Sequence, residues 1–286
     1  MRLFVKQPLA IGGGPGDPGG MTQTLRIATW NINSLRLRLA LLGDLVAGLD
    51  PDVICLQETK VPDELFPHET LADIGYPHFL FAGMKGYNGV AILSRYPLRR
   101  ITDMPDWCGR GDCRHIAAEV EMPSGSVAVH NFYVPAGGDV PDRELNPKFG
   151  HKLDFIAEAQ AWFAANPPRR SVLVGDLNIA PLVNDVWNHK QLLGVVSHTP
   201  VETEGLLAWQ REGFVDAVRH FVPESEKLYT WWSYRNRDWK VANRGRRLDH
   251  VWITPDLEPQ SHAVLVNARD WTKGSDHVPV CVAIGC

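Results

Sequence analysis

The stretch LRIATWNI, residues 25–32, is followed by a helical pattern over residues 36–48 and then by VICLQE, residues 53–58. Both quoted runs are short and rich in apolar and β-branched residues, which is typical of buried strands. The segment between them has an amphipathic period and ends at GLDP (48–51), because proline cannot continue a helix. Together they predict a β-α-β unit, the first unit of an α/β fold.

The same alternation continues to the end of the chain. Several runs are joined by tight turns such as PSGS (123–126), and so many strands favour two mixed sheets packed face to face over one parallel sheet. We therefore expect an α/β sandwich that forms a single domain over residues 21–286. Further strands are predicted at residues 79–82, 89–94, 115–122, 126–134, 171–177, 247–253, 261–266 and 278–284, and helices at residues 148–166 and 203–212.

The composition excludes several classes of protein. The chain has 286 residues, of which 44% are hydrophobic and 22% charged, which is ordinary globular composition. The formal net charge of −4 argues against a surface that is positive throughout, so any nucleic-acid surface must be local. Residues 1–20, which contain GGGPGDPGG, are expected to form a flexible leader or to lie upstream of a true start at Met21.

The cysteines and the apolar runs bear on localisation. Five cysteines form no CxxC pair and lie near no histidine at zinc-ligand spacing, which favours reduced thiols. No apolar run approaches the roughly 18 residues of a membrane span. We expect a cytoplasmic protein that does not bind membranes, and we infer no obligate protein partner.

Polar residues interrupt the apolar strands at their ends. Each one alone is more often a turn former or a helix cap than a catalytic group. The set as a whole is rich in oxygen donors and suits a hard cation such as Mg²⁺, with Mn²⁺ as a substitute, whereas zinc is disfavoured because thiol and multiple-histidine ligation is missing. The set also contains a candidate for every role in phosphodiester hydrolysis. Its members are Asn31, Asn33, Glu58, Tyr133, Asp176, Asn178, Asp249, Asp276 and His277.

Seven sequence blocks contain these residues. At them the chain resembles the exonuclease III and abasic endonuclease family, within the endonuclease/exonuclease/phosphatase superfamily, from about residue 25 to about residue 283. The resemblance implies a DNase-I-like, four-layer α/β sandwich. It also implies a Mg²⁺-dependent DNA repair phosphodiesterase that cuts 5′ to abasic sites and removes 3′-blocking groups or 3′ nucleotides from duplex DNA, leaving 3′-hydroxyl and 5′-phosphate ends. The blocks are TWNIN (29–33), LQETK (56–60), NFYVP (131–135), GDLNIAP (175–181), TWWSYR (230–235), RRLDHV (246–251) and GSDHVPV (274–280).

The resemblance also assigns roles to individual residues. Glu58 is expected to be the main metal carboxylate, and Asp176 to orient or activate the attacking water. His277 would contact the phosphate or carry a proton while Asp249 orients it. Tyr133 would donate a hydrogen bond or act as a phenolate, so Asp176, Tyr133 and His277 all stay open as the general base, with Asp176 preferred. Asn178 is expected to donate to phosphate oxygens, and the full expected metal set is Asn31, Glu58, Asp176, Asn178, Asp276 and His277.

DNA binding must come from local positive charge, because phosphate contacts supply most of the affinity. Two stretches qualify: residues 95–100, with three arginines, and residues 234–247, with six basic residues and interleaved aromatics. Relatives fill the Arg246 position with a bulky apolar residue and often carry Asn or Gln where this chain has Ala136. The expected DNA contacts are Arg110, Arg114, Trp231, Tyr234, Arg235 and Arg246.

Two alternatives remain open at this point. The same chemistry could act on another phosphodiester, such as RNA or undamaged DNA, or the chain could be a non-catalytic member that binds DNA ends. The second alternative predicts losses among the catalytic residues, and none of Glu58, Asp176, Asp249, Asp276 or His277 is missing. A serine-hydrolase mechanism is rejected because no GxSxG elbow surrounds Ser275.

Overall fold

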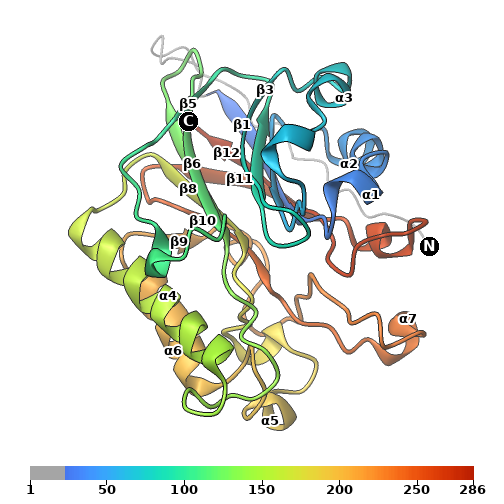
Figure 1. Cartoon of the computed structure of the whole chain (residues 1–286), viewed down its shortest axis with the longest axis vertical. Helices are drawn as coiled ribbons and strands as arrows, with labels where there is room; N and C mark the ends of the chain where they lie inside the picture. Colours follow the sequence, from blue (N-terminus) through green and yellow to red (C-terminus); the bar gives the residue numbers. More distant parts are fainter. Residues whose placement is uncertain (1–22) are drawn as a thin grey trace, which may run out of the picture.

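A computed structural model describes residues 23–286, so the expected leader at residues 1–20 lies outside the described residues. Two six-stranded sheets pack face to face (Figure 1). The first sheet contains β1 (Thr24–Asn31), β2 (Val53–Gln57), β3 (His78–Ala82), β4 (Val90–Ser94), β11 (Glu258–Val264) and β12 (Val280–Gly285). The second contains β5 (Leu98–Arg100), β6 (His115–Val120), β7 (Val127–Tyr133), β8 (Ser171–Asp176), β9 (Val215–Asp216) and β10 (Asp249–Ile253).

Both sheets are mixed, as the sequence predicts. Their strand orders are β11-β12-β1-β2-β4-β3 and β5-β6-β7-β8-β10-β9. Each sheet contains one parallel pair, β1 with β2 and β7 with β8, and its other neighbours are antiparallel. The expected fold class is therefore confirmed.

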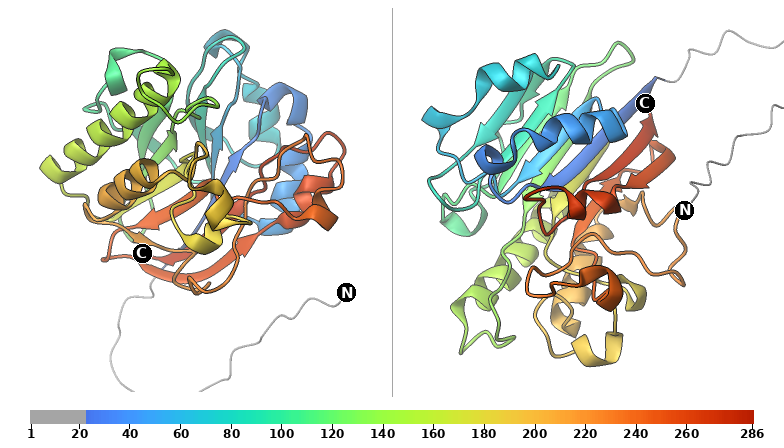
Figure 2. Two further views of the ribbon diagram at one scale, coloured as in Figure 1. Left: turned by 90° about the horizontal axis from the view of Figure 1, so that it is seen from below. Right: turned by 90° about the vertical axis from the view of Figure 1, so that its right-hand side faces the viewer.

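Helices cover the two outer faces of the sandwich, which gives four layers (Figure 2). The first sheet is covered by α1 (Leu35–Arg38), α2 (Leu41–Leu49) and α3 (His68–Asp73), and the second by α4 (Pro147–Ala165) and α6 (Pro200–Gln210). The loops contain α5 (His189–Leu192), α7 (Trp239–Ala242) and four 3-10 turns, at Asp63–Leu65, Trp107–Gly109, Val183–Asp185 and Val266–Asp270. Within residues 23–286, no helix is long and apolar enough to cross a membrane.

The main hydrophobic core lies between the sheets. Ile27, Cys55, Val129, Val174 and Val251 are each at most 1% exposed there. Side chains on a strand alternate between its two faces, so their strand neighbours point outward and pack against the helices. Both faces of the central strands are thus buried, which explains why these strands are apolar almost throughout.

The helix predicted at residues 36–48 is broken into two. At the break, the amide of Leu42 donates to the carbonyl of Leu39 at 3.2 Å and that of Gly43 donates to Ala40 at 3.2 Å. These bonds span three residues and form tight turns. The second helix closes at Asp50, whose left-handed backbone (φ 44°) lets its amide donate to the carbonyl of Val46.

The remaining elements lie close to their predicted positions. Helix α4 begins where the side chain of Asn146 accepts a hydrogen bond from the amide of Lys148 at 3.1 Å. Helix α6 begins three residues earlier than predicted, at Pro200, because proline suits the first turn of a helix. The sequence did not predict α3, α5, α7, β5 or β9, which span two to six residues each and are too short for a clear period.

Candidate active site

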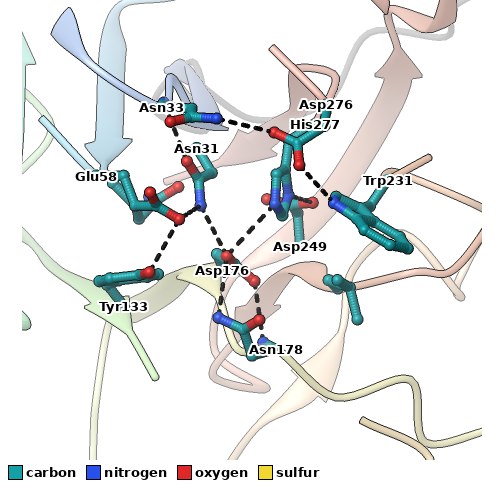
Figure 3. A network of polar contacts seen from close by, with 12 residues as sticks. Asn31, Asn33, Glu58, Tyr133, Asp176, Asn178, Trp231, Asp249, Asp276 and His277 are labelled. Atoms are coloured by element: carbon teal, nitrogen blue, oxygen red, sulfur yellow. Dashed lines mark hydrogen bonds and ion pairs between the residues drawn. The ribbon is translucent and has the colours of Figure 1, made fainter. Parts of the chain in front are cut away.

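Functional side chains from both sheets meet at one edge of the sandwich (Figure 3). Asn31 ends β1 and Glu58 directly follows β2, while Tyr133 and Asp176 end the parallel pair β7 and β8. Asp249 begins the antiparallel strand β10 and lies opposite Asp176 in the register. The fold therefore brings together residues that are up to 218 positions apart, counting from Asn31 to Asp249.

Asn31 links the two sheets. Its Nδ2 donates to Glu58 Oε1 at 2.9 Å and to Asp176 Oδ2 at 2.8 Å. Its Oδ1 accepts the amide of Asn33 at 3.1 Å, so its hydrogen-bonding groups are fully used although the side chain is 0% exposed. One carboxamide thus fixes the spacing of two carboxylates.

Glu58 is an ionised carboxylate at neutral pH. Burial opposes its charge, but hydrogen bonds from Asn31 and Lys60, together with the charge of Lys60, hold the pKa of Glu58 below its usual value. Lys60 Nζ lies 2.7 Å from Glu58 Oε2 and 2.7 Å from Asn33 Oδ1. The ammonium of Lys60 therefore lies between an oxygen of Glu58 and an oxygen of Asn33.

Tyr133 is a hydrogen-bond donor at this site. Its hydroxyl donates to Glu58 Oε1 at 2.9 Å, and the guanidinium of Arg114 lies 4.8 Å from its ring centre. Burial, followed by the charges of Glu58 and Asp176, raises the pKa of Tyr133 well above its ordinary value. The neutral phenol is favoured over the phenolate at physiological pH.

His277 connects Asp249 with Asp176. Its Nδ1 lies 2.9 Å from Asp249 Oδ2, which also accepts the hydroxyl of Thr230 at 2.6 Å, and its Nε2 lies 3.6 Å from Asp176 Oδ2. Burial opposes the charge on His277, but Asp249 and Asp176 outweigh it and raise its pKa to about 10. Burial raises the pKa of Asp176 to about 7, against the opposing effect of His277. The pair is therefore an imidazolium beside an unusually basic carboxylate.

Asn178 donates hydrogen bonds to Asp176 in this structure. Its Nδ2 donates to Asp176 Oδ2 at 3.1 Å and to the carbonyl of Val134 at 2.9 Å, and its backbone amide donates to Asp176 Oδ1 at 3.0 Å. Both amide hydrogens are thus used within the protein. Asn178 orients the carboxylate, and a direct bond from its side chain to phosphate requires one of these contacts to open.

Asp276 lies on the other side of the same cluster. Its Oδ1 accepts from Asn33 Nδ2 at 3.2 Å, and its Oδ2 accepts from Trp231 Nε1 at 2.9 Å. The metal set expected from the sequence is therefore divided. Asn31, Glu58 and Asp276 contact one another through amides near Lys60, whereas Asp176, Asp249 and His277 form a buried chain whose polar atoms lie within 4.8 Å.

The first group fits a divalent cation. It offers carboxylate and amide oxygens, and the ammonium of Lys60 between Glu58 and Asn33 is a stand-in for positive charge at that position. In the second group the ligand atoms are also close enough together to hold a cation, but in the metal-free protein Asp249 and Asp176 hold His277 as an imidazolium. The geometry therefore suits His277 to contact with an anion.

A cavity of about 980 Å³ opens beside these residues. It is lined by Glu58, Asp176, Asn178, Asp276 and His277 and, among the expected DNA contacts, by Trp231, Arg235 and Arg246. Its lining also includes the apolar side chains of Leu192, Val195 and Leu248. Three of the six expected DNA contacts thus share one cavity with the catalytic candidates.

The other expected DNA contacts lie elsewhere. Arg110 is exposed in the loop before β6, and Arg114 pairs with Asp112 beneath Tyr133. The hydroxyl of Tyr234 donates to the carbonyl of Gly274 at 2.8 Å and accepts from Arg38. Arg114 and Tyr234 therefore contact protein groups next to the site and help to hold them in place.

The arginines at residues 95–100 do not join the site. Arg95 pairs with Asp50 and Arg99 with Glu119. Strand β5 pairs with the far end of β6, at Val120, whereas the catalytic cluster lies beyond the other end, near His115. Arg95 and Arg99 therefore pair with nearby carboxylates, away from the catalytic cluster.

Sequence reasoning missed two lysines near the site. Lys60 follows Glu58 in the LQETK block, so its position was a usable signal. Lys152 lies within α4 and is 0% exposed, with Nζ 2.8 Å from the carbonyl of Asn178 and 2.6 Å from Glu202 Oε1. A lysine within an amphipathic helix gives no sign of such burial, because lysines on such helices are usually exposed.

A profile of the Endonuclease/Exonuclease/phosphatase family matches residues 28–277, which include every residue of this cluster. The chain belongs to that family. Asn31 lies where the two sheets meet, and its side chain bonds a carboxylate from each of them. The seven sequence blocks that predicted the family supply the residues of this cluster.

The relatives of the chain are nucleases. Exodeoxyribonuclease III of Haemophilus influenzae is 31% identical over 271 residues, which cover 90% of this chain and 98% of that protein. The DNA repair nuclease APEX1 of Danio rerio is 29% identical, over 91% of this chain and 82% of that protein. These similarities confirm the predicted enzyme class, a nuclease hydrolase, and argue against a non-catalytic member.

Solved structures give the same result. An AP endonuclease from Archaeoglobus fulgidus has a TM-score of 0.81 and 31% identity, covering 90% of this chain and 98% of that chain. The 3′ phosphatase NExo from Neisseria, bound to a product DNA hairpin, has a TM-score of 0.82 and 31% identity with the same coverage. The predicted DNase-I-like sandwich is therefore confirmed.

Proposed function

We propose that this chain is a Mg²⁺-dependent DNA repair nuclease that cuts duplex DNA 5′ to abasic sites and removes blocking groups or nucleotides from 3′ ends. The products are a 3′-hydroxyl and a 5′-phosphate. The observation that carries the proposal is the bridge from Glu58 through Asn31 to Asp176, whose two carboxylates line one cavity together with His277 and Trp231. Mn²⁺ is expected to substitute for Mg²⁺.

Glu58, Asn31 and Asp276 would hold the cation. Their oxygens match its preference, and Lys60 can move away from Glu58 because its stem is flexible and its head is partly exposed. When bound, the cation supplies positive charge that stabilises the negative charge developing on the phosphate. The remaining roles fall to side chains of the protein.

Asp176 is assigned as the general base. Its raised pKa makes it a better proton acceptor than an ordinary carboxylate, and hydrogen bonds from Asn31 and Asn178 fix its orientation. His277, charged and held by Asp249, would contact a non-bridging phosphate oxygen through Nε2. Tyr133 would donate its hydroxyl to the same phosphate once it leaves Glu58.

The substrate assignment rests on the cavity and the relatives. Trp231 and Arg235 line the space next to the catalytic cluster, where an aromatic face and a cation suit an opened nucleotide and its backbone. The relatives named above are an exodeoxyribonuclease, a DNA repair nuclease, an AP endonuclease and a 3′ phosphatase. The five cysteines form no disulfide, which supports a reducing compartment such as the cytoplasm.

The first test compares substrates in one magnesium buffer. A duplex with one internal tetrahydrofuran abasic analogue is incubated beside a duplex with a recessed undamaged 3′ end, a single-stranded RNA and soluble inositol phosphates. We expect a nick on the 5′ side of the analogue and shortening of the recessed strand. Turnover of the RNA or the inositol phosphates alone would contradict the proposal.

The second test removes the chemistry. Glu58→Gln and Asp176→Asn should each lower kcat at least about 100-fold, since each removes a charge that acts in the transition state, and excess chelator should abolish wild-type activity. The matched control is Asp154→Asn, an exposed carboxylate of α4 paired with Arg143, which should keep the wild-type rate. Full activity of either site variant would refute the assigned mechanism.

A further inference from the structure

Arg246 carries a partly buried guanidinium that has no acidic partner. Within residues 23–286, no carboxylate oxygen lies within ion-pairing distance of it, and burial lowers its pKa despite the more distant charge of Glu202. Its neighbour Arg247 shows the usual arrangement, because it pairs with Asp185 at 2.9 Å and with Asp216 at 2.5 Å. Cations withdrawn from water are generally paired with anions, so Arg246 is an exception that needs a counter-charge.

The side chain is nevertheless fixed in place. Its Nη1 donates to the carbonyl of Val196 at 2.9 Å and to the hydroxyl of Ser197 at 2.6 Å, and its Cζ lies 5.5 Å from the ring centre of Trp231. Nε and Nη2 donate to no group of the described residues, and neither is sealed from solvent. Arg246 therefore presents two free donor groups to the cavity in a preset orientation.

These donors lie in the cavity that contains the catalytic cluster. His277 and Asp176 line the same space. Trp231 contacts both Arg246, whose Cζ lies over its ring, and Asp276, which accepts its Nε1 hydrogen. Leu192, Val195 and Leu248 line the same cavity and give part of it an apolar surface. An anion bound there would be partly shielded from water, which strengthens its attraction to the cation.

We propose that Arg246 is a specificity-determining residue that selects 3′-end remnants carrying a second negative charge, such as a carboxylate one carbon from the phosphate ester. The inference rests on the proposed function and names the substrate class that the cavity prefers. Nε and Nη2 form the parallel pair of donors that matches the two oxygens of a carboxylate. A neutral sugar remnant leaves the guanidinium without a counter-charge.

The reaction balances without any additional reagent. Water adds to phosphorus, and the bond between phosphorus and the 3′ oxygen of the DNA breaks. The 3′ oxygen takes up a proton and remains on the DNA as a hydroxyl. The phosphate leaves together with the remnant, so the group held by Arg246 departs in the product.

The test uses two duplexes that differ only at a recessed 3′ end. One end carries a phosphate ester of glycolic acid, and the other carries the isosteric ester of glycolamide, which is neutral. The wild-type kcat/KM should be about ten-fold or more higher for the acid, because hydrogen bonds between charged groups are strong in a shielded site. In Arg246→Gln the ratio should fall to about one.

Two further variants complete the design. Arg246→Lys keeps the charge but offers a single donor point, so its ratio should lie between those of the wild type and the glutamine variant. Arg99→Gln is the matched control, because Arg99 pairs with Glu119 at the far end of the second sheet, and it should keep the wild-type ratio. Thermal melting establishes that each variant is folded, and if Arg246→Gln does not fold, the lysine variant decides.

Equal wild-type rates on the two ends would overturn the proposal. It would also fail if Arg246→Gln slowed both substrates by the same factor, because Arg246 would then contact the common DNA backbone. A wild-type protein that releases neither end would instead contradict the proposed function itself.

Discussion

Asn31 has a chemical reason to be an amide. It gives its two hydrogens to carboxylates of different sheets, and an aspartate at this position would have none to give. A third negative charge would also repel Glu58 and Asp176 in a site that is closed to water. The carboxamide therefore holds two like charges close together without adding to their repulsion.

The hydroxyl of Tyr133 provides a prediction at the same scale. Tyr133→Phe removes the bond to Glu58 and the proposed donor to phosphate, so kcat on an abasic duplex should fall about 10- to 100-fold. The ring and its contact with Arg114 remain, so the melting temperature should change little. Tyr96→Phe, at a hydroxyl that accepts from Gln23 and lies away from the site, is the control and should be fully active.

The His277–Asp249 pair makes stability depend on pH in the metal-free protein. The pKa of His277 is raised from 6.5 to about 10, because Asp249 and Asp176 outweigh the effect of burial. Its stabilising contribution is therefore fully present below about pH 6.5 and is lost as the pH rises toward 10. Asp176, whose pKa is about 7, titrates mainly below that window.

Urea unfolding in chelator measures this effect. The free energy of unfolding of the wild type should exceed that of Asp249→Asn by the largest amount near pH 6.5. The difference should shrink toward pH 10, by at most about 1.4 kcal/mol per pH unit for one proton. A difference that stays constant over this range would mean that His277 is already neutral in the folded protein.

The sequence identified the reactive residues better than their partners. Glu58, Asp176 and His277 stand out because each interrupts an apolar strand, and the structure brings all three to one edge. Whether Asn178 donates to a phosphate or to Asp176 depends on distances that span two sheets, which no local pattern encodes. The lack of a partner for Arg246 could likewise be seen only once its surroundings were placed.

At the scale of elements, helix α4 reaches into the site through Lys152. Its Nζ contacts the carbonyl of Asn178 at 2.8 Å and that of Ala136 at 3.3 Å, and it pairs with Glu202 of α6 at 2.6 Å. Glu202 in turn accepts the amide of Ser197 at 2.9 Å, on the loop that holds Arg246. One buried ion pair therefore ties three loops around the cavity to two helices.

A double-variant cycle tests this tie. Lys152→Met leaves the charge of Glu202 buried without a partner and should destabilise the protein by about 3–5 kcal/mol in urea unfolding. Adding Glu202→Gln removes that charge and should restore most of the stability. The kcat of the double variant should stay low, because the carbonyls of Asn178 and Ala136 have lost their anchor. Wild-type kcat in the double variant would mean that the lysine serves stability alone.

The long elements were predictable and the breaks between them were not. The period of residues 36–48 is that of one helix, yet two helices are separated at Leu39 and Ala40, where hydrogen bonds span three residues although the backbone stays right-handed. Strand β9 has two residues and gives no alternation to detect. Such features follow from packing against the sheets, which competes with local preference and prevails.

At the scale of the molecule, a net charge of −4 has to coexist with binding to a polyanion. The affinity for an abasic duplex should therefore fall steeply with salt while the melting temperature stays nearly constant. Arg235→Gln should reduce the slope of log Kd against log salt concentration by about one, because one phosphate contact is lost. Arg99→Gln should leave the slope unchanged, and an equal effect of both substitutions would exclude a local DNA surface.

The bridge through Asn31 also bears on how the enzyme fails when heated. Its two carboxylate partners belong to different sheets, so the site exists only while the sheets keep their alignment. No loop or helix can melt by itself and take both partners away. Loss of activity on heating should therefore coincide with loss of the whole sandwich, without a warm interval in which a folded but inactive protein accumulates.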